Sequence, residues 1–376
     1  MWTFLRCLLL LPLALAAAER ARDVGVPFDG TPGPWNAITD VRGVEVGHRT
    51  LISGEGAHAV RTGVTVVWPR GKQTGTPVFG GWFSLNGNGE MTGTAWVEES
   101  GEVNGPVMIT NTHSVGMVRD AFIQWKVKRA GQAGEPSEWS LPIVAETWDG
   151  YLNDVNGFHV HDTDVAAALE GARSGPVAEG NVGGGTGMVC YGFKGGIGTA
   201  SRRAGNYTVG VLVQCNCGRR PLLRIAGVPV GEEIAKSMPP LARAAPGGDR
   251  DVGSIIIVVA TDAPLLPNQL KRLAHRAALG LARTGSISGN GSGDLFLAFS
   301  TANPQANSAT GPVSVTMLPN DSMDGLFEAT VEATEESIVN AIVGAQTMTG
   351  VEGHTVTALP HDALRRILAK YNRRAQ

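Results

Sequence analysis

The segment that most constrains the fold of this chain is an unbroken run of strand-forming apolar residues at 255–260. A run of this kind, bounded by turn signals, predicts a strand buried in the interior. A loop-like, glycine-rich stretch leads into it from Gly247, and Gly253 and Ser254 stand at the junction. If the bond between those two residues is cut, Ser254 carries both a hydroxyl and a free α-amine, which together form a nucleophile with its own base.

Length and composition indicate a compact globular protein. The chain has 376 residues, enough for one or two domains, with 43% hydrophobic residues and 51 glycines. Charged residues make up 17%, against about 25% in ordinary domains. A formal net charge of −3 gives no electrostatic reason to expect a nucleic-acid partner. The sequence contains no Gly-x-Ser-x-Gly, Walker A or full Gly-x-Gly-x-x-Gly pattern, and we predict no cofactor.

The N-terminus has the pattern of a secretory signal peptide over residues 1–18. Arg6 precedes an apolar run at residues 7–18 that ends in small residues. The run is shorter than the roughly 20 residues that a membrane-spanning helix needs, and a buried N-terminal helix is the alternative. We therefore expect an exported protein, periplasmic or extracellular. Its mature chain would begin near Ala17 or Glu19 and would not remain in the membrane.

Three cysteines remain once Cys7 leaves with the signal: Cys190, Cys215 and Cys217. Cys215 and Cys217 are two apart on a predicted strand, so they face the same side and are poorly placed to bond each other. We interpret all three as small buried apolar residues. A disulfide between Cys190 and one of the other two is the alternative in an oxidising compartment.

Short apolar runs and amphipathic patterns occur without a regular βαβ repeat, which favours a layered α+β fold. A helix with Val118, Phe122 and Trp125 on one face is predicted after residue 116. Residues 22–60 and 85–90 are predicted to be loops and turns, and residues 219–253 an extended, exposed connector. The remaining strands are predicted at 62–68, 107–111, 141–145, 207–214 and 294–300, and the remaining helices at 162–172, 267–283, 325–344 and 362–371.

One cluster of metal-ligand residue types occurs, at His159, His161 and Asp162. Two imidazoles and a carboxylate are suitable zinc ligands, but the spacing is loose and no second cluster completes the set. His161 and Asp162 also suit the start of the helix predicted at 162. We predict no metal site.

Four polar residues near strand ends are candidates for chemistry. Ser292 and Asp294 are two apart at the entry to a strand, so both can point to one face, where Asp294 would orient the Ser292 hydroxyl. Asn216 closes an apolar strand, and its amide could donate to a developing oxyanion. Glu146 ends another strand, where it would either hold a substrate ammonium or be a solvated loop acid. Taken alone, Ser292 and Asp294 are better explained as a turn serine and a strand-capping aspartate, and the alternative for Asn216 is a turn residue at a strand end.

Several segments together resemble one family, the self-processing aminopeptidases that comprise L-aminopeptidase/D-amidase-esterases and β-peptidyl aminopeptidases. The similarity extends from about residue 30 to residue 365. It is carried by Asn-Val-Gly-Gly-Gly-Thr-Gly-Met at 181–188, Phe-Lys-Gly-Gly-Ile-Gly-Thr-Ala-Ser-Arg at 193–202, Val-Gly-Val-Leu-Val-Gln-Cys-Asn at 209–216, Gly-Ser at 253–254, Ala-Thr-Asp-Ala-Pro at 260–264 and Ser-Gly-Asp-Leu-Phe-Leu-Ala-Phe-Ser-Thr at 292–301.

This resemblance implies a four-layer αββα sandwich of the N-terminal-nucleophile type. The precursor would cut itself between Gly253 and Ser254 into an α chain, residues 19–253, and a β chain, residues 254–376. The two chains would stay associated as one domain and assemble further, usually as tetramers of heterodimers.

The same resemblance implies a role for each candidate residue. Ser254 would be the nucleophile and, through its α-amine, the general base, with Ser292 and Asp294 as partners of that amine. Asn216 would lie in the oxyanion hole, and Glu146 would bind the amino group of the substrate.

The implied activity is hydrolysis of short peptides, amides or esters that begin with a small L-, D- or β-amino acid. Trp148 stands where relatives lead us to expect tyrosine or an aliphatic residue, and its indole either narrows the site or stacks away from the substrate. Two alternatives remain. One is acyl transfer, as in ornithine acetyltransferases of similar fold, which use threonine at the cleaved junction. The other is an uncleaved binding protein on the same scaffold.

Overall fold

A buried central strand organises the structure, a computed structural model that describes residues 19–74, 76–134, 139–238, 253–306 and 311–375. This strand, β11 (Ser254–Thr261), is buried at every position. It pairs antiparallel with β10 (Tyr207–Asn216) on one side and parallel with β12 (Gly293–Ser300) on the other. The buried strand predicted from the apolar run is therefore confirmed.

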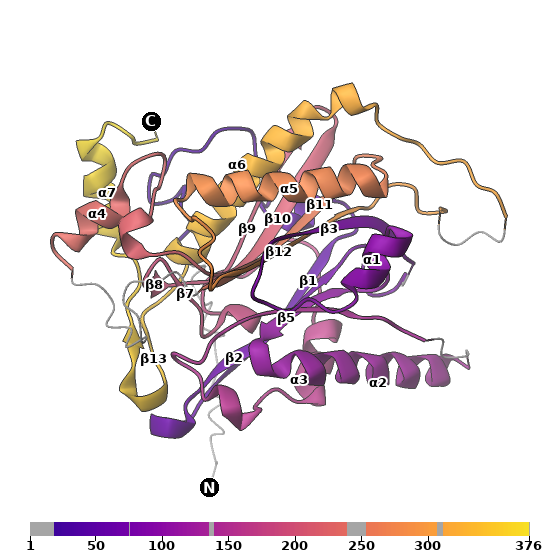
Figure 1. Cartoon of the computed structure of the whole chain (residues 1–376), viewed down its shortest axis with the longest axis horizontal. Helices are drawn as coiled ribbons and strands as arrows, with labels where there is room; N and C mark the ends of the chain where they lie inside the picture. The colour runs from indigo at the N-terminus through magenta and orange to yellow at the C-terminus, as the bar shows by residue number, and fades with distance from the viewer. Residues whose placement is uncertain (1–18, 75, 135–138, 239–252, 307–310, 376) are drawn as a thin grey trace, which may run out of the picture.

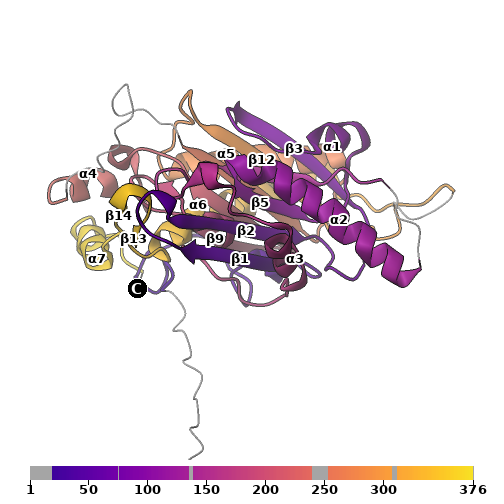
Figure 2. The same cartoon turned by 90° about the horizontal axis from the view of Figure 1, so that it is seen from below.

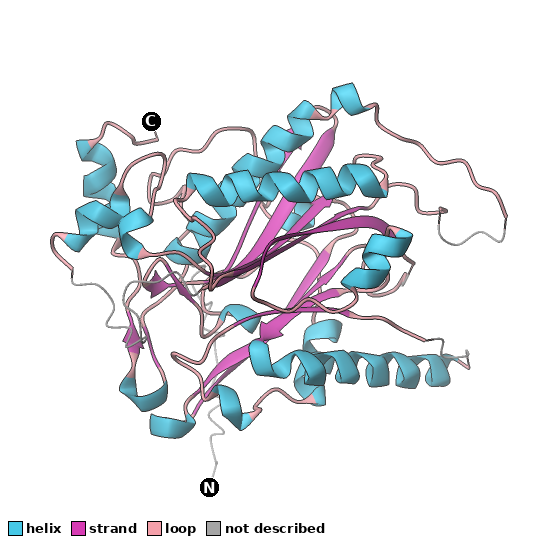
Figure 3. Cartoon of the chain, in the orientation of Figure 1, coloured by secondary structure: helices cyan, strands magenta, loops and turns pink. Residues whose placement is uncertain are grey.

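Two sheets lie at the centre of the molecule (Figure 3). The larger has the order β4-β3-β12-β11-β10-β9, and its other strands are β3 (Val78–Gly87), β4 (Glu102–Val103) and β9 (Gly196–Ala204). The smaller, in the order β1-β2-β5-β6, comprises β1 (Glu45–Ser53), β2 (Val60–Trp68), β5 (Val107–Asn111) and β6 (Ile143–Thr147). Two short hairpins at one end of the molecule are β7 (Val189–Cys190) with β8 (Phe193–Lys194) and β13 (Met348–Thr349) with β14 (Thr355–Val356).

Helices cover the outer face of each sheet (Figure 1). Helices α5 (Pro267–Arg283) and α6 (Asp324–Val343) pack on the larger sheet. Helices α2 (Val115–Ala133) and α3 (Asp162–Glu170) pack on the smaller one, and Figure 2 shows α2 crossing it diagonally. The peripheral helices are α1 (Thr94–Ser100), α4 (Val230–Ala235) and α7 (His361–Lys370). None of the helices in the described ranges combines the length and apolar character needed to cross a membrane.

The side chains of β11 alternate between two cores. The odd-numbered residues from Ile255 pack toward α5 and α6, and the even-numbered residues from Ile256 fill the space between the two sheets. A third apolar cluster lies between the smaller sheet and helices α2 and α3. Three cores separate four layers in the order helix, sheet, sheet, helix, and this confirms the predicted α+β fold with αββα layering.

Most predicted elements are confirmed with small shifts of their ends. The helix predicted at 267–283 coincides with α5, and the strand at 107–111 coincides with β5. The helix predicted at 325–344 is α6. The strand predicted at 141–145 lies two residues later, as β6. Strong apolar periodicity explains these successes.

Three long strands are not predicted from the sequence. β1 lies within residues 22–60, which are predicted to be loop, and β3 extends to Gly87 inside the predicted turn segment 85–90. No strand is predicted where β9 lies. β1 is an edge strand with exposed polar side chains, so it has no apolar run. β9 carries polar residues that are buried with partners: Arg202 Nη2, for example, lies 2.6 Å from Glu336 Oε2. In a sequence, polar residues that are buried with partners look the same as the polar residues of an exposed loop.

The prediction of an exposed connector at 219–253 is wrong for its first half. Residues Arg220–Leu222 form a helical turn, and α4 follows. Prolines and glycines interrupt the apolar pattern of this segment, so the sequence does not show that its apolar residues are buried. Residues 239–252 of this predicted connector lie outside the described residues. The buried apolar residues are Leu223, Ile225, Val228, Val230 and Ile234.

The first described residues are held against α6. The Ala21 N–H donates to Asn340 Oδ1 over 3.0 Å. The Arg22 guanidinium donates twice to Glu336, with both distances 2.8 Å. A bidentate pair of this kind fixes geometry as well as adding energy. The segment that begins near Glu19 is therefore part of the folded body.

Replacing Ile257 by alanine should destabilise the protein by about 2–5 kcal/mol, because it leaves a cavity in a tightly packed core. Ile257 is fully buried, whereas Ile52 on edge strand β1 is 55% exposed. Ile52→Ala is the matched control and should change stability by at most about 0.5 kcal/mol. Thermal unfolding followed by circular dichroism measures both, and equal melting temperatures for the two variants would contradict the role assigned to β11.

Candidate active site

Three strand ends meet at Ser254. It is the first residue of β11, and its register partners are Asn216, the last residue of β10, and Gly293, the first residue of β12. The Gly293 N–H donates to Ser254 Oγ over 3.2 Å. Ser254 is only 6% exposed. Its hydroxyl is thus held by the sheet and largely shielded from bulk water.

Ser292 and Asp294 lie beside this junction, at the entry to β12. The Ser292 hydroxyl donates to Asp294 Oδ1 over 2.7 Å, and both residues are fully buried. The contact expected from their spacing is therefore present. A buried carboxylate that accepts a hydrogen bond from a hydroxyl fixes the orientation of that hydroxyl.

The side-chain amide of Asn216 is held at both ends. Its Oδ1 accepts the Val189 N–H over 2.8 Å, and its Nδ2 donates to the Trp148 carbonyl over 3.0 Å. Directly opposed residues on antiparallel strands place their side chains on the same face, so this amide lies next to Ser254. Nδ2 carries two hydrogens, and among the described residues only Trp148 accepts one. The second hydrogen makes no hydrogen bond to a described residue.

Glu146 reaches the site from the smaller sheet. It is the fourth residue of β6 and is buried. Its Oε1 accepts the Glu90 N–H over 3.0 Å, and its Oε2 accepts the Thr112 hydroxyl. Burial raises the pKa of this carboxyl above its usual value, while the bonds from Thr112 and Glu90 lower it. A buried carboxylate with so few donors favours a cationic partner.

A single glycine separates Glu146 from the residue that contacts Ser254. A Cβ atom on Gly89 would lie 3.3 Å from Glu146 Oε1 and 3.3 Å from Gly293 Cα. Gly293 in turn could not carry a side chain, because its Cβ would overlap the Asn88 carbonyl and lie 2.9 Å from Gly89 Cα. These close approaches bring the carboxylate and the serine into one site, although they come from different sheets.

Gly253 is the residue before the serine, and it too has no room for a side chain. A Cβ there would overlap the Asn216 carbonyl oxygen and lie 2.6 Å from Cys217 Cα. The backbone on both sides of the Gly253–Ser254 bond is therefore packed against the end of β10.

The other sequence candidates have different surroundings. Trp148 is 40% exposed, and its indole lies against Gly150, while its carbonyl accepts from Asn216. His159 Nε2 lies 3.1 Å from Asp154 Oδ2, and His161 occupies the position before α3. Among the described residues, His159, His161 and Asp162 do not gather at ligand distance of one another.

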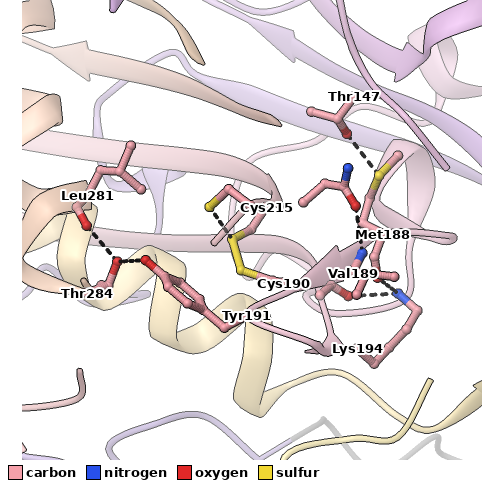
Figure 4. Close-up of a disulfide and its surroundings, with 12 residues drawn as sticks. Thr147, Met188, Val189, Cys190, Tyr191, Lys194, Cys215, Leu281 and Thr284 are labelled. Atoms are coloured by element: carbon pink, nitrogen blue, oxygen red, sulfur yellow. Dashed lines mark hydrogen bonds between the residues drawn. A yellow bond between two sulfur atoms is a disulfide. The ribbon is translucent and has the colours of Figure 1, made fainter. Parts of the chain in front are cut away.

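All three described cysteines are buried, and two of them are joined (Figure 4). Cys190 and Cys215 form a disulfide whose Cα atoms are 5.8 Å apart, and Cys217 Sγ lies 3.8 Å from Cys215 Sγ. The interpretation of three unpaired residues is wrong for this pair, and the alternative that pairs Cys190 is confirmed. The bond fastens hairpin β7–β8 to the end of β10, next to Asn216.

Sequence reasoning missed the residues that support the candidates. Thr112 could have been noticed, because it directly follows the strand predicted at 107–111. Val189 acts through its backbone N–H, for which a sequence carries no signal. Lys194 is fully buried beside Val189, and a single lysine gives no indication of burial.

The layering and the serine at the start of a central strand define a class, the N-terminal-nucleophile hydrolase fold. Residues 36–356 match peptidase family S58, and the chain belongs to this family. It is an aminopeptidase, as its relatives and structural neighbours are.

Two relatives are similar over nearly the whole chain. The β-peptidyl aminopeptidase BapA of Sphingosinicella microcystinivorans is 56% identical over 389 aligned residues, covering 98% of this chain and 96% of the relative. The protein of the same name from Sphingosinicella xenopeptidilytica is 50% identical and covers 96% and 94%.

Two solved structures share the fold at high similarity. The L-aminopeptidase D-Ala-esterase/amidase of Ochrobactrum anthropi superposes with a TM-score of 0.87 at 47% identity, over 95% of this chain and 99% of that one. A β-aminopeptidase from a Burkholderia species gives a TM-score of 0.85 at 48% identity, over 94% and 99%.

Gly293→Ala should lower kcat/KM at least 10-fold, because the new Cβ displaces the Asn88–Gly89 backbone and misaligns the site; a shift of about 1 Å can cost roughly 100-fold in rate. Gly87→Ala is a matched control: Gly87 is the register partner of Gly293, and its nearest neighbour would be Ser84 Oγ at 3.7 Å. Hydrolysis of an aminoacyl p-nitroanilide measures both variants. Equal loss in both would show that the Gly89–Gly293 contact does not shape the site.

Proposed function

We propose that this protein is an exported, self-cleaving serine aminopeptidase that removes small N-terminal residues from short peptides, amides or esters. The observation that carries the proposal is the position of Ser254, the first residue of the central strand, between Asn216 and Gly293. Cleavage before Ser254 would convert a strand end into a chain terminus without moving the strand.

Self-cleavage is the first reaction proposed. Ser254 Oγ attacks the Gly253 carbonyl carbon, the C–N bond breaks, and the nitrogen keeps the electron pair and gains the hydroxyl proton. In the resulting ester the Ser254 α-amine is already free, and water then cleaves the ester bond, which releases the Gly253 carboxylate and restores the Ser254 hydroxyl. Two features support this: the hydroxyl is already held in place by Gly293, and the bare Gly253 lies against Asn216.

Substrate hydrolysis would then use the same groups. The Ser254 α-amine, whose reference pKa is about 7.7–8.0, takes the Oγ proton as Oγ attacks the substrate carbonyl. The free Nδ2 hydrogen of Asn216 would donate to the oxyanion. The amine returns its proton to the leaving group, and water hydrolyses the acyl ester. Ser292, oriented by Asp294, would hold the amine.

The substrate class follows from the carboxylate and from the relatives. Glu146 is buried with two donors and would pair with the free ammonium of an N-terminal residue. The relatives are named for β-peptides and for L-aminopeptidase and D-Ala-esterase or amidase activity. We therefore propose substrates with small L-, D- or β-amino acids at the N-terminus, and we assign the exposed indole of Trp148 to the edge of the acyl pocket.

Export and assembly belong to the same proposal. Residues from Glu19 onward pack on the folded body, which supports a mature chain that starts near that residue and a signal peptide that ends before it. The α chain (19–253) and β chain (254–376) would remain together, because β11 pairs with β10 across the cut. We propose further assembly of these heterodimers, with a tetramer favoured, in the periplasm or outside the cell.

The alternatives are less well supported. Membership of a peptidase family is inconsistent with a protein that only binds a ligand. An acyl transferase of the ornithine-acetyltransferase type would have threonine where this chain has Ser254. We expect no turnover of N-acetylornithine.

Ser254→Ala should abolish both self-cleavage and hydrolysis, since it removes the only nucleophile in the proposed scheme. Intact-mass spectrometry of the purified wild-type enzyme should show a β chain that begins at Ser254 and an α chain that begins near Ala17 or Glu19. Ser237→Ala, on an exposed serine ahead of the junction, should behave as the wild type. A wild-type chain that stays uncut for days yet hydrolyses substrate would refute the scheme.

Glu146→Gln should raise KM for an aminoacyl p-nitroanilide by about 10- to 150-fold. This range corresponds to the loss of a hydrogen bond to a charged group, which contributes about 1.5–3 kcal/mol. Glu99→Gln is the control, because the Glu99 side chain is exposed on helix α1 and does not act on Glu146. Burial raises the pKa of Glu146, so the carboxylate is protonated at a higher pH than an ordinary glutamate. As the pH falls, wild-type KM should therefore begin to rise at a higher pH than it would with an ordinary glutamate. A Glu146→Gln enzyme with the same acid limb in KM would contradict this assignment.

A further inference from the structure

Lys194 is a buried cation that the proposed reaction does not use. It is the second residue of β8 and is fully buried. Burying an ammonium group has a large unfavourable desolvation free energy, which an unbranched apolar residue of similar length in the same space would not have. Lysine is almost never fully buried unless it has partners. The partners of Lys194 therefore indicate its role.

The Lys194 ammonium gathers carbonyl groups from a single segment. Nζ donates to the carbonyls of Met188 at 2.9 Å and Gly195 at 2.8 Å, with Gly185 farther away at 3.4 Å. These acceptors are spread over residues 185–195, so one side chain closes this whole segment on itself. Figure 4 shows Lys194 extending along Met188 and Val189, with the Cys190–Cys215 disulfide beside them.

The segment that Lys194 closes supplies the donor that orients Asn216. Val189 is the residue after Met188 and the register partner of Lys194, and its N–H donates to Asn216 Oδ1 over 2.8 Å. That bond fixes where the amide oxygen lies, and so it decides whether the nitrogen or the oxygen faces Ser254. If Val189 moves, Asn216 can turn its oxygen toward the developing negative charge and repel it.

The second contact of Asn216 also has a link to Lys194. Asn216 Nδ2 donates to the Trp148 carbonyl, and the next residue, Asp149, is fully buried. Burial lowers the pKa of Lys194 to about 7, and the Asp149 carboxylate opposes that shift. Asp149, next to the residue whose carbonyl accepts from Asn216, thus lies within electrostatic reach of Lys194.

We propose that Lys194 is a positioning residue for catalysis, acting through Met188 and Val189 to hold the Asn216 amide in the orientation that donates to the oxyanion. This inference rests on the proposed function, because it assumes that Asn216 serves the oxyanion. A group that acts only on the transition state changes kcat and leaves KM nearly constant.

A double-mutant cycle tests the inference on the full-length protein. Lys194→Met, Asn216→Ala and the double variant are compared with the wild type in hydrolysis of a β-alanyl p-nitroanilide. Rates are expressed per Ser254 N-terminus, counted by intact mass, so that slower self-cleavage does not enter kcat. Lys126→Met is the control, since Lys126 lies on the outer helix α2 and donates to the Ser140 hydroxyl; it should leave kcat and KM unchanged.

Lys194→Met should lower kcat at least 10-fold with KM within about twofold, and Asn216→Ala should lower kcat by roughly 100- to 1,000-fold. If Lys194 acts through Asn216, the double variant stays within about threefold of Asn216→Ala alone. Full additivity, or a change in KM alone, would overturn the inference. An unchanged kcat in Asn216→Ala would instead refute the oxyanion role within the proposed function.

Lys194→Gln serves as the second variant, because its amide keeps two N–H donors without the charge. It should show a smaller loss of kcat than Lys194→Met, with KM unchanged. Thermal unfolding by circular dichroism confirms that each variant is folded. If neither variant folds, Lys194 is a residue that the core requires for folding, and the positioning role is refuted.

Discussion

The structure depends on one strand that is buried on both faces and paired on both edges. β11 contributes side chains to the core beneath α5 and α6 and to the core between the sheets, so it cannot shift along its axis without breaking both. Its first residue is Ser254, and at that level its neighbour β10 ends at Asn216 and its neighbour β12 begins at Gly293. The burial that stabilises the fold therefore also fixes the position of the reactive hydroxyl.

The groups around that hydroxyl come from distant parts of the chain, because the ends of three neighbouring strands meet there and the smaller sheet lies against them. Asn216 and Gly293 lie on the two neighbours of β11, while Glu146 approaches from the smaller sheet. Next to the site, the backbone of Gly89 lies close to both Glu146 and Gly293, with no side chain between them. Side chains at these two positions would push the carboxylate away from the serine, which explains why both residues are glycine.

The sequence predicted what depends on long apolar patterns and missed what depends on partners. The run 255–260 and the amphipathic helix 267–283 could be placed because their patterns need no knowledge of neighbours. β9 could not, because Arg202 is buried only by virtue of Glu336, far along the chain. In the site, spacing placed Ser292 beside Asp294 correctly. The backbone donor at Val189 and the burial of Lys194 exist only in the folded chain.

The distribution of cysteine has a consequence for how such an enzyme can be made. No cysteine occurs after residue 253, and the disulfide joins two residues that both precede it. Under the proposed cut, no covalent bond would link the two polypeptides, and backbone pairing of β10 with β11 and of β12 with β3 would form the seam between them. The precursor closes these pairings within one chain, whereas separated chains would have to find each other at a rate set by concentration. Folding must then precede cutting, and the mature enzyme would owe its persistence to slow unfolding more than to ready refolding.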